Sequence, residues 1–227
     1  MSKNPYLFIP SFYFVINPKI LKGAIVSIDI LKPVPNVIYF QYNPTSISRK
    51  FQPRNSSEGG SKEEVLRINN PPSESIDMDL EIDATDQLEK PEDHPITVEN
   101  GIYPQLSSLE LLLYPNSGIV IANKILAASG TLEISPPVGP LTLLIMGPKR
   151  ILPVKLTSLS ITEEEHDINL NPIRAKASVS FDVLTYNDFS LLHPANALTI
   201  ANQISKETLS ILNTVNSLAA AGASIPF

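Results

Sequence analysis

An alternation of apolar and polar residues, which is typical of a β-strand with one buried face, runs through several segments of the chain. It is clearest at 76–83, where isoleucine, methionine and leucine alternate with four acidic residues, so one face is predicted to be buried and the other strongly acidic. Residues 174–183 repeat the pattern with alanine, valine and phenylalanine on the apolar side. A shorter strand is predicted at 24–31, with Val26, Ile28 and Ile30 on one side.

The segment 37–48 (VIYFQYNPTSIS) predicts two strands with a sharp interruption between them. Proline has no amide hydrogen and disfavours helical geometry in the residue before it, so the first strand is predicted to stop at Asn43-Pro44 and the second to begin at Ser46. Three consecutive strands are predicted at 141–146, 151–161 and 174–186. Residues 169–172 (NLNP) are predicted to form the turn of the last hairpin.

Helical spacing appears in two places. Leucines recur three and four residues apart within 103–113, which predicts a short amphipathic helix that covers the core of the sheet. From Pro194 to Leu218 apolar residues recur at the same steps, which predicts a helix about 37 Å long. Residues 52–75 and 84–101 are interpreted as polar loops. Residues 116–140 hold two apolar stretches that the pattern leaves unassigned, and 116–139 are interpreted as a candidate insertion.

The composition favours one β-rich domain. The 227 residues include 21 prolines and 9 glycines, and proline is tolerated at strand ends and in stiff loops rather than inside helices or central strands. The predicted division is an extended N-terminal arm at 1–22, a β domain at 23–189, and a helical C-terminal part at 190–227. A net charge of −6 with 17 lysines and arginines argues against a nucleic-acid groove, and no apolar run is long enough for membrane insertion.

The side chains that could carry chemistry form no recognisable site. His94, His166 and His193 lie far apart, and the polar cluster at 163–167 (EEEHD) matches no calcium-binding loop, so it is interpreted as a solvated hairpin end. The acidic residues of 76–83 would project about 6–7 Å apart, which predicts a wet sheet face, the lining of a channel, or a contact with a basic partner. There is no cysteine and no nucleophile, phosphate-binding or dinucleotide-binding motif. No catalytic, cofactor-binding or metal-binding residue is predicted, and the chain is expected not to be an enzyme.

The order of these segments resembles the tube-protein domain of contractile injection systems, the phage-tail-like machines of bacteria and some archaea. The resemblance spans about residues 24–186 and includes a leucine-rich short helix, a strand with LTSLSIT and a strand with PIRAKASVSF. In chain order the matching segments are 24–31, 40–48 (FQYNPTSIS), 75–84, 102–113, 140–147, 156–162 and 172–181. The chain departs from the family at Met146, where a tryptophan usually precedes the glycine. Members with a LysM module continue as a peptidoglycan-binding domain, so cell-wall binding is not carried over to this chain.

The resemblance implies a mainly β fold, a barrel or sandwich of the phage tail-tube type, with one short packed helix and a C-terminal helical extension. It further implies a homo-hexameric ring that joins the inner tube to the spike or baseplate, with the inner tube protein, the spike and baseplate subunits as partners. Assembly into the particle is expected in the cytoplasm. The alternative is a monomeric ligand- or carbohydrate-binding β-sandwich module, and a hydrolase with an unrecognised site is a third class.

Overall fold

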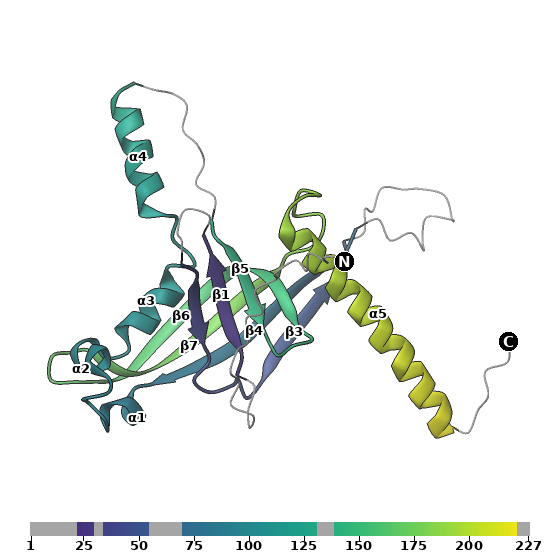
Figure 1. Cartoon of the computed structure of the whole chain (residues 1–227), viewed down its shortest axis with the longest axis horizontal. Helices are drawn as coiled ribbons and strands as arrows, with labels where there is room; N and C mark the ends of the chain where they lie inside the picture. Colours follow the sequence, from purple (N-terminus) through teal and green to yellow (C-terminus); the bar gives the residue numbers. More distant parts are fainter. Residues whose placement is uncertain (1–21, 30–33, 55–69, 131–138, 222–227) are drawn as a thin grey trace, which may run out of the picture.

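A computed structural model describes residues 22–29, 34–54, 70–130 and 139–221 (Figure 1). The predicted arm at 1–22, apart from Lys22, most of the predicted 52–75 loop and the tail after Ala221 lie outside the described residues. The body is one antiparallel sheet of seven strands in the order β2-β1-β5-β6-β7-β4-β3. The strands are β1 (Ala24–Ile28), β2 (Asn36–Tyr39), β3 (Ile47–Gln52), β4 (Ser73–Asp83), β5 (Leu141–Ile145), β6 (Ile151–His166) and β7 (Pro172–Val183).

Five helices accompany this sheet within the described residues, and strand and helix contents are about equal. The predicted β-rich fold with one short packed helix and a C-terminal helix is confirmed. The sheet curls over its core but is not a closed barrel, because β2 and β3, its two edges, form no ladder with each other. The helices are α1 (Thr85–Leu88), α2 (Pro95–Asn100), α3 (Tyr103–Glu110), α4 (Ser117–Ala128) and α5 (Pro194–Ala221).

The core is built on the two strands with the clearest alternation. In β4 and β7 the apolar residues point inward, and facing pairs such as Ile76 with Phe181 are fully buried. Leu80 lies opposite Ala177 in the same register, so a large side chain meets a small one, and both are buried. The predicted burial of these two faces is therefore confirmed.

The prediction for β1 was correct in position but wrong in phase. Ile25 and Ser27 are buried, whereas Val26 is half-buried and Ile28 is 41% exposed. The inward side of β1 carries Ile25 and a buried serine, while the other side carries Val26 and the exposed Ile28, so apolar residues occupy both sides. The alternation at 26–31 therefore did not identify the inward face.

The interruption at Asn43-Pro44 is where the chain passes from one edge of the sheet to the other. Residues 36–39 pair with β1, and residues 47–52 pair with β4 at the opposite edge. Between these strands the side-chain amide of Gln41 donates to the carbonyl oxygen of Asp83 at 2.7 Å and accepts from its amide nitrogen at 2.8 Å. Asn43 accepts a hydrogen bond from the amide of Gly23. A continuous chain segment and a side-chain bridge thus connect the two ends of this open sheet.

The short leucine helix is confirmed as α3, which buries Leu106 and Leu109 in the core. The prediction of a loop at 84–101 was wrong, because α1 and α2 form there. These helices have four and six residues, too few to show a helical period in the sequence. The junction of α2 and α3 is fixed to the sheet by a hydrogen bond from the amide of Ile102 to the carbonyl oxygen of Pro172.

Two elements extend away from the body. Part of the unassigned 116–140 region is α4, and the predicted C-terminal helix is confirmed as α5 (Figure 1). Strand β6 continues to His166, five residues beyond the predicted 151–161, and pairs with β7 up to the turn at 167–171. Its acidic end is tolerated because Arg174 and Lys176 of β7 lie within 4.0 Å of carboxylates of Glu164.

Candidate interaction surfaces

The acidic face of β4 is exposed and is hydrogen-bonded within the sheet. Asp77 accepts from the hydroxyl of Ser180, and Asp79 accepts from the hydroxyl of Ser178, both at 2.6 Å. These carboxylates follow one strand and do not converge on a common point. No group of histidine and acidic side chains among the described residues is arranged to hold a metal ion. The three histidines remain apart, with His166 next to Glu163 and His193 stacked on Phe189.

Two half-buried carboxylates stabilise turns. The hydroxyl of Thr85 donates to Asp83 at the start of α1 and is the largest cause that lowers the pKa of this carboxyl, followed by the Thr85 amide. At the β6–β7 turn, hydrogen bonds from Asn171 lower the pKa of Asp167. Both groups therefore act as caps of local structure.

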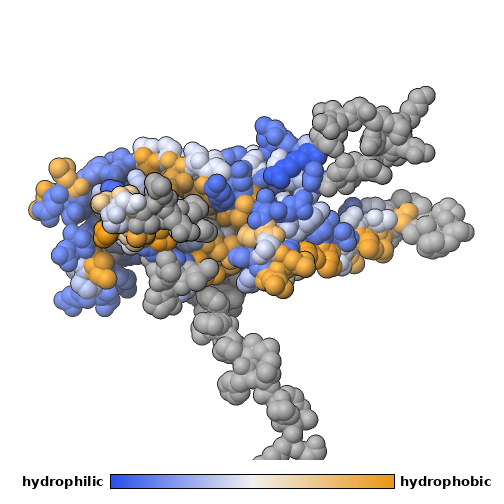
Figure 2. Space-filling model, turned by 90° about the horizontal axis from the view of Figure 1, so that it is seen from above, coloured by the Kyte–Doolittle hydropathy of each residue, from blue (hydrophilic) through white to orange (hydrophobic). Residues whose placement is uncertain are grey.

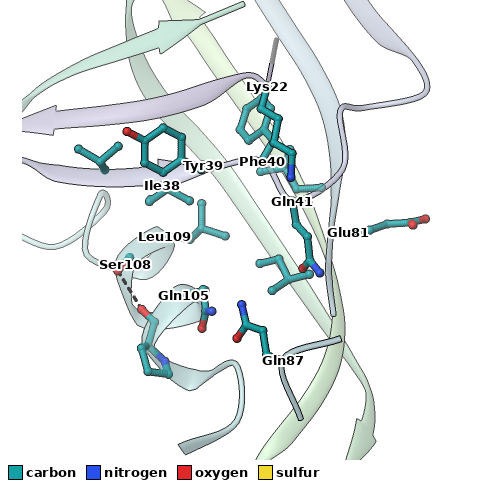
Figure 3. A pocket seen from close by; sticks show the side chains of 14 residues that line it. Lys22, Ile38, Tyr39, Phe40, Gln41, Glu81, Gln87, Gln105, Ser108 and Leu109 are labelled. Carbon is teal, nitrogen blue, oxygen red and sulfur yellow. Dashed lines mark hydrogen bonds between the residues drawn. The ribbon is translucent and has the colours of Figure 1, made fainter. Parts of the chain in front are cut away.

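A pocket of about 450 Å³ lies between β2, β4 and α3 (Figure 3). Gln41, Gln87 and Gln105 lie around the same space in Figure 3. The Gln41 amide is used in the bridge to β4, and Gln87 accepts from the hydroxyl of Thr97. The amide oxygen of Gln105 is buried without a hydrogen-bond partner among the described residues. We call the gap between β2 and β4, where the curled sheet does not close, the seam. The pocket is the part of this seam that no other described element covers.

A buried carboxylate connects three elements near the start of α5. Glu74 of β4 is 5% exposed and pairs with Arg49 of β3, with 2.8 Å from the guanidinium Nε to the carboxylate. Lys206 of α5 lies 3.4 Å from the other carboxylate oxygen. The ring of Phe51 lies beneath the Arg49 guanidinium, 4.9 Å from its centroid. This junction links α5 to β3 and β4 through side chains, while the helix itself packs on β6.

Sequence reasoning missed Glu74, although the sequence contained a signal for it. The apolar residues of 76–82 occupy the even-numbered positions, and Glu74 continues that series inward. An acidic residue in the buried phase of a strand requires a cationic partner, because an unpaired buried charge is strongly unfavourable. Its partners lie 25 and 132 positions away, so their identities were not accessible from local pattern.

Helix α4 carries apolar side chains on most of its circumference but buries none of its residues. Ile121 is 58% exposed and Ile125 is 64% exposed. The helix is attached by Asn116, which caps it by accepting from the amide of Gly118 and donates to Asp29. A helix that is apolar nearly all round is normally buried, so this surface is suited to a partner outside the described residues.

Helix α5 also shows an apolar surface. Figure 2 shows apolar residues along the length of this helix, where it extends beyond the sheet. The exposed members include Ile204, Ile211 and Val215, each more than half exposed. None of the helices among the described residues is long and apolar enough to cross a membrane.

Compared with known proteins, the chain matches no protein-family model and no curated protein sequence.

Proposed function

We propose that this protein is a non-enzymatic structural subunit of a contractile injection particle, which forms a hexameric ring between the inner tube and the spike or baseplate. The sequence resemblance described above points to this family of particles, and the exposed helices give a physical reason for assembly. The proposal rests most directly on α4 and α5, two helices that leave the sheet with apolar residues uncovered.

Helix α4 carries the argument furthest. An isolated helix of 12 residues is marginal in water, because nucleation is unfavourable and few hydrogen bonds follow it. In a folded protein such a helix is normally stabilised by packing, yet α4 has no buried residue. In the proposed ring a neighbouring subunit covers it, which supplies the missing contacts.

The free edge of β3 also suits a ring subunit. Its six residues pair with β4 on one side and with no strand among the described residues on the other. Exposed edges are templates for pairing with another chain, and a head-to-tail contact between identical subunits closes into a ring when the rotation permits. In the proposed assembly this edge contacts the next subunit.

The test begins with the particle. An affinity tag on this chain is expected to co-purify tube, spike and baseplate subunits in the fraction that sediments as particles. Cryo-electron microscopy of that fraction is expected to show six copies at the base of the tube. In native mass spectrometry, six copies of 24.8 kDa would appear at about 149 kDa. Particles that assemble fully without this chain would contradict the proposal.

A matched pair of variants tests the role of α4. Ile121→Lys with Ile125→Lys places two charges on the exposed apolar side and is expected to abolish incorporation into the particle while leaving the melting temperature unchanged. Glu92→Lys changes the net charge by the same two units in an exposed turn and is expected to assemble normally. Equal incorporation of both variants would show that α4 is not a subunit contact.

A further inference from the structure

The contacts of helix α5 with the body lie in its N-terminal half, up to Lys206. Ala195, Asn196 and Thr199 are buried, and Asn202 donates to the carbonyl oxygen of Ile151 at 2.5 Å. Lys206 reaches Glu74, as described above. Every residue of 203–217 is exposed, and the part beyond Lys206, about 16 Å of helix over 207–217, projects from the sheet without a partner in another described element.

A heptad spacing runs along the exposed part of α5 and includes Ile204, Ile211 and Val215, whereas the exposed Ile200, Leu209 and Leu212 lie outside it. Steps of four and three residues lead from Ala197 to Leu218 without a break, and this regular 3.5-residue period is the pattern of a helix that packs along another helix. One position in the series is a threonine and the others are apolar. We call these positions the stripe: Ala197, Ala201, Ile204, Thr208, Ile211, Val215 and Leu218.

The stripe lies on the side of α5 that faces away from the body. At 100° per residue, Thr199, Asn202 and Lys206, which contact the sheet, lie on one side of the helix. Ile204 and Ile211 lie on the opposite side and are 56% and 66% exposed. The contacts that hold α5 on the sheet therefore leave the stripe exposed from Ala197 to Val215, and Leu218 is half-exposed.

The charge distribution favours a second copy of this chain as the occupant. The chain carries a net charge of −6, so two copies repel each other unless their contact is uncharged. Lys206 and Glu207 are the only charged residues of α5, and 208–221 contain none. Lys206 is directed to Glu74, and Glu207 accepts from Gln203 on its own helix. The stripes of two copies of this chain can thus pack against each other without bringing like charges together.

We propose that α5 helices from several copies of this chain pack in parallel through the stripe around a common axis. The inference deepens the proposed ring and rests on it for the number of copies. β-Branched residues occur at both core positions of the heptad, Thr208 and Val215 at one and Ile204 and Ile211 at the other. Such a pattern favours more than two helices. A parallel arrangement also follows if the copies are related by rotation about one axis.

Disulfide cross-linking of the full-length chain tests the proposal without background, because the natural sequence contains no cysteine. Ile211→Cys and Leu218→Cys are made separately and oxidised in dilute solution. In a parallel bundle each cysteine lies next to its own counterpart, within the distance that a disulfide requires. Both are expected to cross-link at least about tenfold faster than Asn213→Cys, which lies on the opposite side of α5.

The two positions together fix the direction of the helices. In an antiparallel pair only one point along the helix can meet its own counterpart, so cross-linking at both positions requires a parallel arrangement. Cross-linking at the rate of Asn213→Cys, or at one position alone, would overturn the proposal. Either result would indicate a different protein as partner of the stripe or an antiparallel contact.

A second pair of variants measures the association itself. Ile211→Asp with Val215→Asp is expected to weaken self-association by at least about 100-fold in sedimentation experiments, because two apolar side chains lose their burial. Asn213→Asp with Ser217→Asp adds the same charge on the opposite side and is expected to associate as the natural chain does. Equal association of both variants would also overturn the proposal. Cross-links in a chain that is absent from injection particles would leave the self-association intact and reject the proposed function alone.

Discussion

The side-chain bridge between Gln41 and Asp83 gives a quantitative prediction about how the two ends of the sheet are connected. Gln41→Met preserves the volume of the side chain but can make neither hydrogen bond to the backbone of Asp83. Each hydrogen bond contributes about 0.5–1.5 kcal/mol net, and the half-buried site allows water to replace part of this. We therefore expect the free energy of unfolding to fall by about 1–2 kcal/mol, which lowers the melting temperature by about 3–6 °C.

Hydrogen exchange separates this mechanism from a general loss of stability. The amide of Ala84 bonds to the carbonyl oxygen of Ile173 in β7, so the preceding amide, of Asp83, points to the other side of β4. There its acceptor is Gln41. In Gln41→Met the Asp83 amide is expected to lose protection, while that of Ala84 changes only with global stability.

The control is Gln52→Met, the same substitution at an exposed position of the neighbouring strand β3. It is expected to change the unfolding free energy by less than about 0.5 kcal/mol in urea denaturation. The reasoning is refuted if Gln41→Met behaves like Gln52→Met and the Asp83 amide exchanges at its original rate.

Three further substitutions have expected outcomes. Gly101→Ala is expected to lower the free energy of unfolding by at least about 3 kcal/mol in denaturation experiments, because Gly101 has a φ of 57° and a Cβ there would lie 2.2 Å from a carbonyl oxygen of β7. The control Gly139→Ala has open space around the new Cβ and should leave the free energy of unfolding unchanged. Gln105→Met is expected to leave the free energy of unfolding unchanged or to raise it by about 1 kcal/mol in the same assay, since it removes a buried acceptor that has no partner among the described residues. A clear loss of stability would show that this oxygen is bonded. Thr85→Ala is expected to raise the pKa of Asp83 toward its ordinary value in an NMR titration. Because the pKa of Asp83 is lowered in the folded state, this carboxylate stabilises the fold at pH values above its unfolded-state pKa. The stabilisation is lost as the pH falls through the folded-state pKa, and the loss should be smaller in Thr85→Ala than in the natural chain.

Much of the sheet could be predicted from the sequence, because a strand with one buried face carries its own signal. The alternation in β4 and β7 identified the inward residues correctly, such as Ile76 in β4 and Phe181 in β7. The same reasoning gave the wrong phase for β1, since apolar residues occupy both sides of this strand and the inward side also carries Ser27. Helix α4 escaped prediction for a related reason: its apolar residues surround the axis, so no face stands out.

The contacts that hold the body together could not be predicted in the same way. Gln41 and Asp83 are 42 positions apart, and either residue alone is typical of a polar loop or strand end. Only the curl of the sheet brings them together. For the candidate surfaces the sequence showed the heptad spacing of the stripe in α5. Only the contacts of Asn202 and Lys206 with the sheet showed that the stripe residues face away from the body.

The single segment that serves both edges of the sheet also limits how far the body can be deformed. A load that pulls β1 away from β4 is carried by the covalent chain between β2 and β3 after the Gln41 bridge breaks. The seven residues 40–46 can span at most about 25 Å when fully extended. The seam can therefore open and close again under mechanical stress, but residues 40–46 act as a tether that sets its maximum width without any disulfide.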